Sequence, residues 1–218
     1  MSKKVSPLLV RLVVLFTSCL IISNILANRM IQVGHWSMDA GNLLFPVTYI
    51  LSDVFSEVYG YKWSRRVTWW AAAMNLLFAC LVSLVNVLPA PEYFEPLHFK
   101  LALGSSFRIV IASLVSYVVG DLVNDRVFRR MKCGRNGMKG FAGRAIVSSI
   151  FGQIVDSALF VSIAFYGTMS IGELIGMMGL NIVVKVAYEI IVLPATYKVT
   201  TLVYEKENNL GGFINEQD

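Results

Sequence analysis

The sequence predicts an all-α integral membrane protein: a bundle of six transmembrane helices with both termini in the cytoplasm and a central polar cavity. Of its 218 residues, 56% are hydrophobic and only 15% are charged, whereas soluble domains carry about 25% charged residues. Six apolar stretches approach the roughly 20 residues that a helix needs to cross a bilayer. Lysine and arginine gather on alternate connections. We interpret residues 1–218 as a single transmembrane domain.

The predicted spans cover residues 8–28, 42–60, 67–88, 101–124, 144–166 and 173–203. The first follows two lysines, as a secretion signal would, but it is too long for a signal core, so we expect it to be retained. Residues 29–41 are too short and too mixed to span, and they favour a small hairpin that turns at Gly34. Residues 89–99 hold three prolines and three aromatic residues, a composition typical of a loop at the membrane interface.

The positive charges predict the orientation. When the connections are numbered alternately from the N-terminal tail, 15 lysines and arginines fall on one side, two on the other and two within spans. Cytoplasmic loops are the ones that carry this excess, so both termini are expected in the cytoplasm. The basic residues are thereby interpreted as topology signals and lipid headgroup contacts, and nucleic acid is not expected as a partner.

Motifs for cofactors and metals are not found in the sequence. Residues 132–143 are basic and rich in glycine, but Lys139 is followed by Gly140 rather than by serine or threonine, so no P-loop is completed. Three isolated cysteines lack metal-ligand or disulfide spacing, and both histidines lie between spans. We therefore expect no cofactor and no metal site.

Among the charged residues of the predicted spans, seven lie in otherwise apolar sequence. Each costs roughly 2.5–3.5 kcal/mol in hydrocarbon, so we expect these side chains to face one another, water or a polar ligand. They are Asp53, Glu57, Arg108, Asp121, Asp156, Lys185 and Glu189.

Polar side chains recur on one face of five of the predicted helices, at the spacing of a helical turn. These faces predict a shared polar cavity between the helices. The candidate substrate-binding residues are Asn24, Tyr49, Asp53, Glu57, Arg108, Tyr117, Gln153, Asp156, Asn181, Lys185 and Glu189.

The chemistry of this set favours a flat heterocycle with amide-like edges. Amides and carboxylates supply donors and acceptors in planar, paired geometry. The faces for stacking come from Tyr49, Tyr117, Tyr188 and Phe160. A bare metal ion fits less well, because the predicted spans hold no histidine.

Structural roles compete with binding for several of these residues. Lys185 and Glu189 are four residues apart and can neutralise each other on one helix. Asn24 can join helices by hydrogen bonds, and Glu57 can pair with an arginine at the interface. Arg108 lies near the outer end of its span, where it can snorkel to the surface or bridge to a neighbouring helix.

Five sequence motifs resemble the queuosine precursor transporter family, formerly named as vitamin uptake transporters. They are ISNILANRMI (22–31), AGNLLFPVTYILSDVFSEVYGYKWSRR (40–66), RIVIASLVSYVVGDLVNDRVFRRMK (108–132), RAIVSSIFGQIVDSALFVSIAFYG (144–167) and NIVVKVAYEIIVLPATY (181–197). The resemblance covers residues 20–200. The positions that match polar motifs of the family are Asn24, Asp53, Glu57, Arg108, Gln153, Asp156 and Lys185.

The resemblance implies a multi-pass protein of the bacterial inner membrane that imports 7-deazaguanine precursors of queuosine for tRNA modification. These precursors are 7-cyano-7-deazaguanine, its aminomethyl analogue or queuine. Asp156 or Asp53 would read the guanine-like edge, with Gln153 and an asparagine completing the contact. Two alternatives are kept: transport coupled to proton movement through Asp53, Glu57 or Glu189, and assembly of the protein as a homodimer.

Two other function classes are weighed against this one. The second hypothesis is a substrate-binding subunit of an energy-coupling vitamin importer, which would need a partner ATPase complex. A membrane-embedded enzyme is disfavoured, because no span holds a histidine and the residues around Asp53 and Asp156 match no protease motif.

Overall fold

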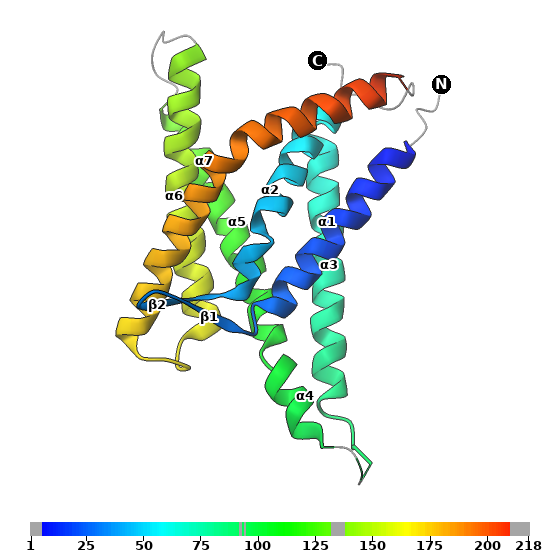
Figure 1. The fold of residues 1–218 in the computed structure, drawn as a ribbon, viewed down its shortest axis with the longest axis vertical. Helices are drawn as coiled ribbons and strands as arrows, with labels where there is room; N and C mark the ends of the chain where they lie inside the picture. The colour runs from blue at the N-terminus through cyan, green and yellow to red at the C-terminus, as the bar shows by residue number, and fades with distance from the viewer. Residues whose placement is uncertain (1–5, 92, 94, 132–137, 210–218) are drawn as a thin grey trace.

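The computed structural model describes residues 6–91, 93, 95–131 and 138–209, and Figure 1 shows them as an elongated helical bundle. Helix α1 (Pro7–Leu26) opens it. The Ser6 side chain accepts a hydrogen bond from the backbone N–H of Leu9 at 2.9 Å, and a proline occupies the first turn. Both features are typical of a helix start. The first predicted span is therefore confirmed as a long apolar helix.

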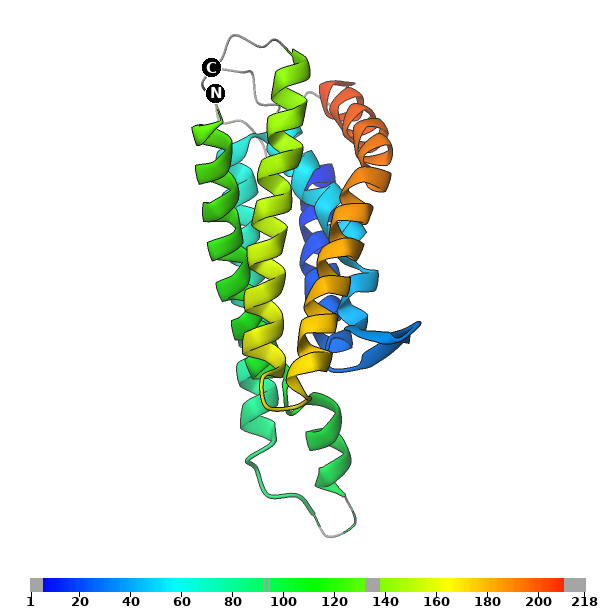
Figure 2. The ribbon, with the colours of Figure 1, turned by 90° about the vertical axis from the view of Figure 1, so that its left-hand side faces the viewer.

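The predicted hairpin follows α1. Strands β1 (Met30–Val33) and β2 (Trp36–Asp39) pair antiparallel, with Val33 opposite Trp36. Gly34 turns the chain with a φ of 63°, which glycine adopts without a Cβ clash. In Figure 2 the hairpin projects sideways from the bundle.

The second predicted span is not one continuous α-helix, although the chain still passes through it from the hairpin to the start of α3. Residues 42–60 are divided among a 3-10 turn η1 (Ala40–Leu43), helix α2 (Phe45–Val54) and a π-turn η2 (Phe55–Tyr59). The chain then reverses at Gly60, whose φ of 84° and ψ of 159° favour glycine strongly. Ten α-helical residues rise only about 15 Å, so α2 is shorter than the hydrocarbon core of about 30 Å.

The other four predicted spans are present, with shifted ends. They are α3 (Tyr61–Val85), α5 (Ser106–Arg130), α6 (Met138–Phe165) and α7 (Ile171–Asn209). With α1, five helices of the described chain are long and apolar enough to cross a membrane. A short helix, α4 (Pro96–Leu103), occupies part of the predicted interfacial loop. The boundaries moved because basic residues extend the helices beyond the apolar stretch.

Helix α7 has 39 residues and bends in its second half (Figure 1). Pro194 lies inside it and lacks the N–H that would continue the hydrogen-bond ladder. The apolar stretch suited to a membrane ends at Val192, just before this proline. The rest of α7 reaches the start of α1, where the Glu207 carboxylate accepts hydrogen bonds from the hydroxyls of Ser6 and Tyr59. The first and last described residues thus lie at the same end of the bundle.

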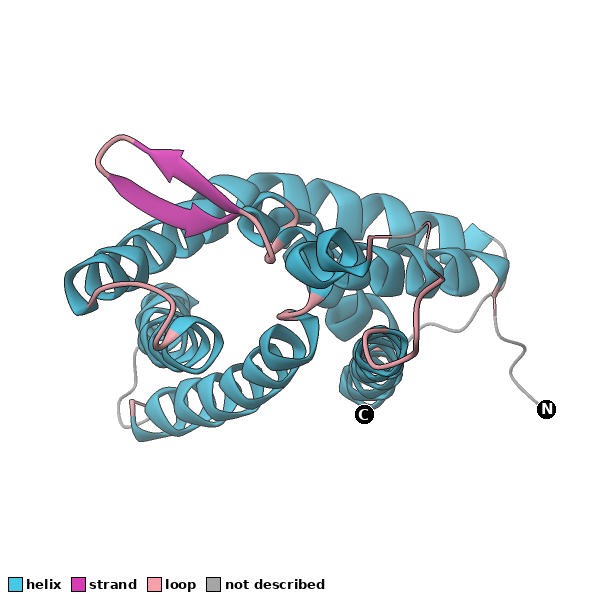
Figure 3. Ribbon diagram, turned by 90° about the horizontal axis from the view of Figure 1, so that it is seen from below, coloured by secondary structure: helices cyan, strands magenta, loops and turns pink. Residues whose placement is uncertain are grey.

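The helices pack in two apolar clusters. One joins α1, α2, η2, α3 and the end of α7, with the rings of Phe16 and Phe55 edge to face at 5.7 Å. The other joins α5, α6 and the start of α7 around Met177 and Val161. Figure 3 views the bundle along its length and shows these helices arranged side by side, with the hairpin at the rim.

Helices α5 and α6 approach most closely at two glycines. A Cβ on Gly120 would lie 2.9 Å from Cβ of Asp156, and a Cβ on Gly152 would lie 3.0 Å from Cβ of Asn124. Glycine permits this approach because it has no side chain. The close contact fixes the position of Asp156, which belongs to the candidate site.

Candidate functional site

The centre of the candidate site is an ion pair between α6 and α7. Lys185 is only 2% exposed, and its Nζ lies 2.5 Å from Oδ2 of Asp156. The same ammonium lies 6.0 Å from the centre of the Phe160 ring. A lysine in this position needs a carboxylate partner, because burying an unpaired charge is very costly. Lys185 therefore pairs across helices, with Asp156 of α6.

Helix α2 joins the same region through Tyr49. Its hydroxyl and the side-chain amide of Gln153 on α6 lie within hydrogen-bond distance, at 3.1 Å to Nε2 and 3.3 Å to Oε1. The charges of Lys185 and Asp156 also act on Tyr49. Three helices thus bring four predicted site residues together: a carboxylate, an ammonium, an amide and a phenol.

A second cluster, at the end of the hairpin, was missed from the sequence. Oδ2 of Asp39 accepts hydrogen bonds from Asn42 at 2.9 Å and from Asn181 of α7 at 3.3 Å. Asn42 also donates to Oδ1 of Asn181 at 2.9 Å. All three side chains are buried. Of them only Asn181 was predicted, because Asp39 falls in the predicted hairpin and Asn42 is the first residue of the predicted span 42–60.

The electrostatics link the two clusters. Burial raises the pKa of the Asp39 carboxyl above its ordinary value of 3.8, while the positive charge of Lys185 and the hydrogen bond from Asn181 act in the opposite direction. Oδ1 of Asp39 and Oδ1 of Asn42 are buried without a hydrogen-bond partner in the described structure. The positive charge of Lys185 therefore acts on two carboxylates, Asp156 on α6 and Asp39 on the hairpin.

The remaining acidic candidates lie beside this centre. Asp53 on α2 and Glu57 on η2 are one turn apart and exposed, as the helical spacing predicted, and Glu189 on α7 is half-buried. The charges of Glu189 and Glu57 both act on Asp53, and α2 packs against α7. Arg65, one of the expected partners of Glu57, instead lies 3.5 Å from Asp121 of α5.

Three predicted site residues lie in other contacts. Asn24 of α1 donates to Oδ1 of Asn75 on α3 at 3.1 Å, which is the helix-joining role weighed against binding. Arg108 bridges α5 to α6 by donating to the carbonyls of Ile163 at 2.5 Å and Tyr166 at 2.7 Å. Tyr117 is 48% exposed and lies beside Thr68 of α3. The contacts described here do not connect them to the Lys185 cluster.

The described residues contain no group of three or more histidine, cysteine or acidic side chains arranged to hold a metal ion. The chemistry available at the centre is hydrogen bonding, charge and ring stacking. Such a set can hold a polar planar molecule between α2, α6 and α7.

A family model described as "Putative vitamin uptake transporter" matches residues 39–199, well over half of the chain. The chain belongs to this family. The resemblance read from the sequence motifs is therefore confirmed. The family is one of transporters, which agrees with the expectation that the protein is not an enzyme, and the five apolar helices make it a multi-pass membrane protein.

Three curated relatives are similar to this member of the vitamin uptake transporter family. "Probable queuosine precursor transporter" of Haemophilus influenzae is 32% identical over 127 residues, which cover 58% of this chain and 51% of the relative. "Queuosine precursor transporter" of Escherichia coli is 25% identical over 145 residues, or 66% and 62%. A "Probable queuosine precursor transporter" of Bacillus subtilis is 22% identical over 203 residues, or 86% and 82%. The chain thus aligns with less than two thirds of the first two relatives, and no solved structure matches it.

The family match begins at Asp39 and ends at Val199. It encloses both polar clusters, including the missed Asp39 and Asn42, while Asn24 lies outside it. A sequence signal for the missed pair existed: Asp39 and Asn42 are three residues apart, a spacing at which an asparagine can donate to the preceding carboxylate in a turn.

Proposed function

We propose that this transporter-family protein imports a 7-deazaguanine precursor of queuosine across the bacterial inner membrane. The observation that carries the proposal is the cluster of Tyr49, Gln153, Asp156 and Lys185, contributed by α2, α6 and α7. The substrate class comes from the names of the three relatives.

The guanine-like edge of such a substrate presents a ring N–H and an exocyclic amine side by side. A carboxylate can accept both hydrogen bonds in paired geometry. Lys185 uses one of about four lone-pair positions of the Asp156 carboxylate, so this group retains acceptor capacity. Asp53, exposed on α2, is the second carboxylate suited to the same edge.

The other substrate groups find matching side chains in the cluster. The side-chain amide of Gln153 can donate a hydrogen bond to the substrate carbonyl once its hydrogen bond to the Tyr49 hydroxyl is broken. The Tyr49 and Phe160 rings offer apolar faces for a planar base, and such stacking contributes about 1–3 kcal/mol per base in nucleic-acid binding. Substrate entry would thus exchange the internal Tyr49–Gln153 contact for a contact with the ligand.

Negative charge dominates the region. Asp39 and Asp156 interact with the buried ammonium of Lys185, and the charges of Glu57 and Glu189 act on a third carboxylate, Asp53. This excess attracts positive charge. Among the precursors, the aminomethyl analogue carries an ammonium group, whereas the cyano compound is neutral. We therefore infer that the aminomethyl analogue is the preferred substrate.

Uptake by the purified protein in liposomes tests the proposal. Radiolabelled aminomethyl-7-deazaguanine should enter, and unlabelled aminomethyl compound should compete more strongly than the cyano compound. Asp156→Asn and Gln153→Leu should reduce initial uptake at least about 10-fold, the effect of losing roughly 1.4 kcal/mol of binding. Asp121→Asn, a carboxylate 45% exposed in its ion pair with Arg65, is the matched control and should retain uptake.

Two outcomes would contradict different parts of the proposal. Unchanged uptake by well-folded Asp156→Asn and Gln153→Leu proteins would reject the site. Absence of uptake for every deazapurine by the unmodified protein would reject the function.

A further inference from the structure

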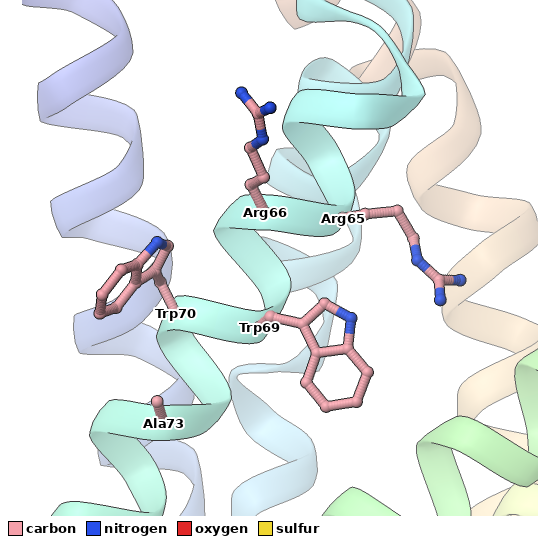
Figure 4. A pocket seen from close by; sticks show the side chains of 5 residues that line it. All are labelled: Arg65, Arg66, Trp69, Trp70 and Ala73. Atoms are coloured by element: carbon pink, nitrogen blue, oxygen red, sulfur yellow. The ribbon is translucent and has the colours of Figure 1, made fainter.

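Helix α3 carries a groove that the proposed transport function does not use. Five residues of this one helix line a cavity of about 380 Å³: Arg65, Arg66, Trp69, Trp70 and Ala73 (Figure 4). Their spacing puts a pair of cations one turn before a pair of indoles, and a small side chain one turn further on. In Figure 4 Trp69 and Trp70 extend to opposite sides of the helix axis, so they flank the groove rather than cover it.

The groove faces outward, away from the polar centre of the bundle. Trp69 is 57% exposed and Trp70 is 68% exposed. Tryptophan buries a large apolar area where it can, so two neighbouring exposed indoles on a membrane helix are expected to contact lipid. Apart from the arginines, the lining of the groove is apolar and consists of the two indole rings and the methyl group of Ala73.

The polarity of the groove runs along the helix axis. Both guanidinium groups lie at the end nearest Tyr61, where α3 begins, and the indoles lie toward its middle. The distribution of lysine and arginine puts this start at the cytoplasmic interface. A charged end at the interface and an apolar end toward the hydrocarbon match the shape of a phospholipid, with its phosphate at one end and its acyl chains at the other.

The arginines are held in place but retain donors. The Arg66 guanidinium lies 5.5 Å from the centre of the Trp63 ring, a cation–π contact that does not itself use up the N–H donors of the guanidinium. Arg65 lies 5.6 Å from the Tyr61 ring centre and 3.5 Å from Asp121, with both partners of that ion pair about half exposed. An exposed pair at this distance contributes little, so a phosphate can replace or share the Asp121 contact.

We propose that this groove binds an anionic phospholipid of the cytoplasmic leaflet. The phosphate accepts hydrogen bonds from Arg66, while Arg65, which extends to the other side of the helix in Figure 4, adds positive charge. One acyl chain lies between Trp69 and Trp70 over Ala73. Arginine suits phosphate because its planar fork of donors matches two phosphate oxygens. The two positive charges select anionic headgroups over zwitterionic ones. This site is independent of substrate identity.

Native mass spectrometry of the delipidated full chain tests the proposal. Phosphatidylglycerol and phosphatidylcholine with identical acyl chains are added separately in detergent, and lipid adducts are counted. Each arginine near an anionic lipid contributes about fivefold in affinity. The double variant Arg65→Gln/Arg66→Gln should therefore lose roughly 30-fold in phosphatidylglycerol binding, and phosphatidylcholine binding should change little.

A matched control removes the same charge elsewhere. Lys198→Gln/Lys206→Gln alters two exposed lysines near the end of α7 and should retain the preference for phosphatidylglycerol. Trp70→Ala, in a second variant, should weaken both lipids together, because it removes chain contact rather than charge. Thermal unfolding in detergent verifies that each variant is folded.

Three results would overturn the proposal. The first is equal binding of the two lipids by the unmodified protein. The second is an unchanged phosphatidylglycerol preference in the folded double-arginine variant, and the third is an equal loss in the lysine control. Glycerol 1-phosphate is added as a separate arm. If it displaces phosphatidylglycerol at similar concentration, the groove is a phosphate site rather than a lipid site.

Discussion

Lys185 is the residue that connects the polar side chains of the interior. It is 2% exposed, and α7 carries it into contact with Asp156 of α6 and into the field of Asp39 on the hairpin. A lysine at this depth holds three segments in register only while its charge is balanced. Sequence spacing offered Glu189, one turn away, as one possible partner, but it could not place Asp156 or Asp39 beside Lys185.

Removing one partner of the Lys185–Asp156 pair should destabilise the folded protein more than removing both. Lys185→Met leaves Asp156 as an uncompensated buried charge, and breaking such a pair costs about 3–5 kcal/mol. The double variant Lys185→Met/Asp156→Asn should recover a large part of that loss. Thermal unfolding in detergent compares the two, and equal destabilisation would mean that the ion pair is not coupled in the folded protein.

Asp39 predicts a pH dependence of stability. Burial raises the pKa of its carboxyl above 3.8 in the folded protein, so the folded state binds a proton that the unfolded state has already released. By linkage, stability is then lost as pH rises through this interval. The unfolding temperature of the unmodified protein, relative to Asp39→Asn, should fall as the pH rises above about 4. A constant difference across this range would contradict the raised pKa.

At the scale of the elements, the contact between α5 and α6 determines where Asp156 lies. The two helices touch at Gly120 and Gly152, with no room for a methyl group on either. Helix α2, in contrast, ends early in a π-turn at Gly60. Interrupted helices of this kind are typical of transporter binding sites, where irregular backbone lines a polar interior. Rigid packing on one side thus faces a broken helix on the other.

Gly120→Ala should lower both stability and substrate uptake. The added Cβ would meet Cβ of Asp156 at 2.9 Å, so α5 and α6 must separate and Asp156 must move. Gly179→Ala is the matched control, because nothing lies within 4 Å of its Cβ position, and alanine is the better helix former by about 1 kcal/mol. Unfolding temperature and liposome uptake are measured for both. Similar behaviour of the two variants would reject a role for the close contact.

For the whole molecule, the described ends of α1 and α7 lie together, joined through Ser6, Tyr59 and Glu207. This contact requires the start of α1 and the end of α7 to be on the same side of the membrane. The excess of 15 basic residues over two predicts that this side is the cytoplasm.

Cysteine labelling tests the orientation of the whole bundle. In a background without the three native cysteines, His35→Cys in the exposed hairpin turn should react with a membrane-impermeant maleimide on intact cells. Lys62→Cys, exposed at the start of α3, should react only after permeabilisation. The two positions lie on opposite predicted sides, and the reverse labelling pattern would invert the topology.

The sequence alone determined the apolar helices, the hairpin at Gly34 and the family, because hydropathy, turn chemistry and motif order are local properties of the chain. It also identified Tyr49, Gln153, Asp156, Asn181 and Lys185, because an ionisable or amide side chain inside an apolar helix needs a partner. Only the tertiary structure decided which partners they have. Lys185 pairs with Asp156 of a different helix, and Asp39 reaches Asn181 across 142 residues. Such contacts depend on how helices pack, and neither helical spacing nor composition contains that information.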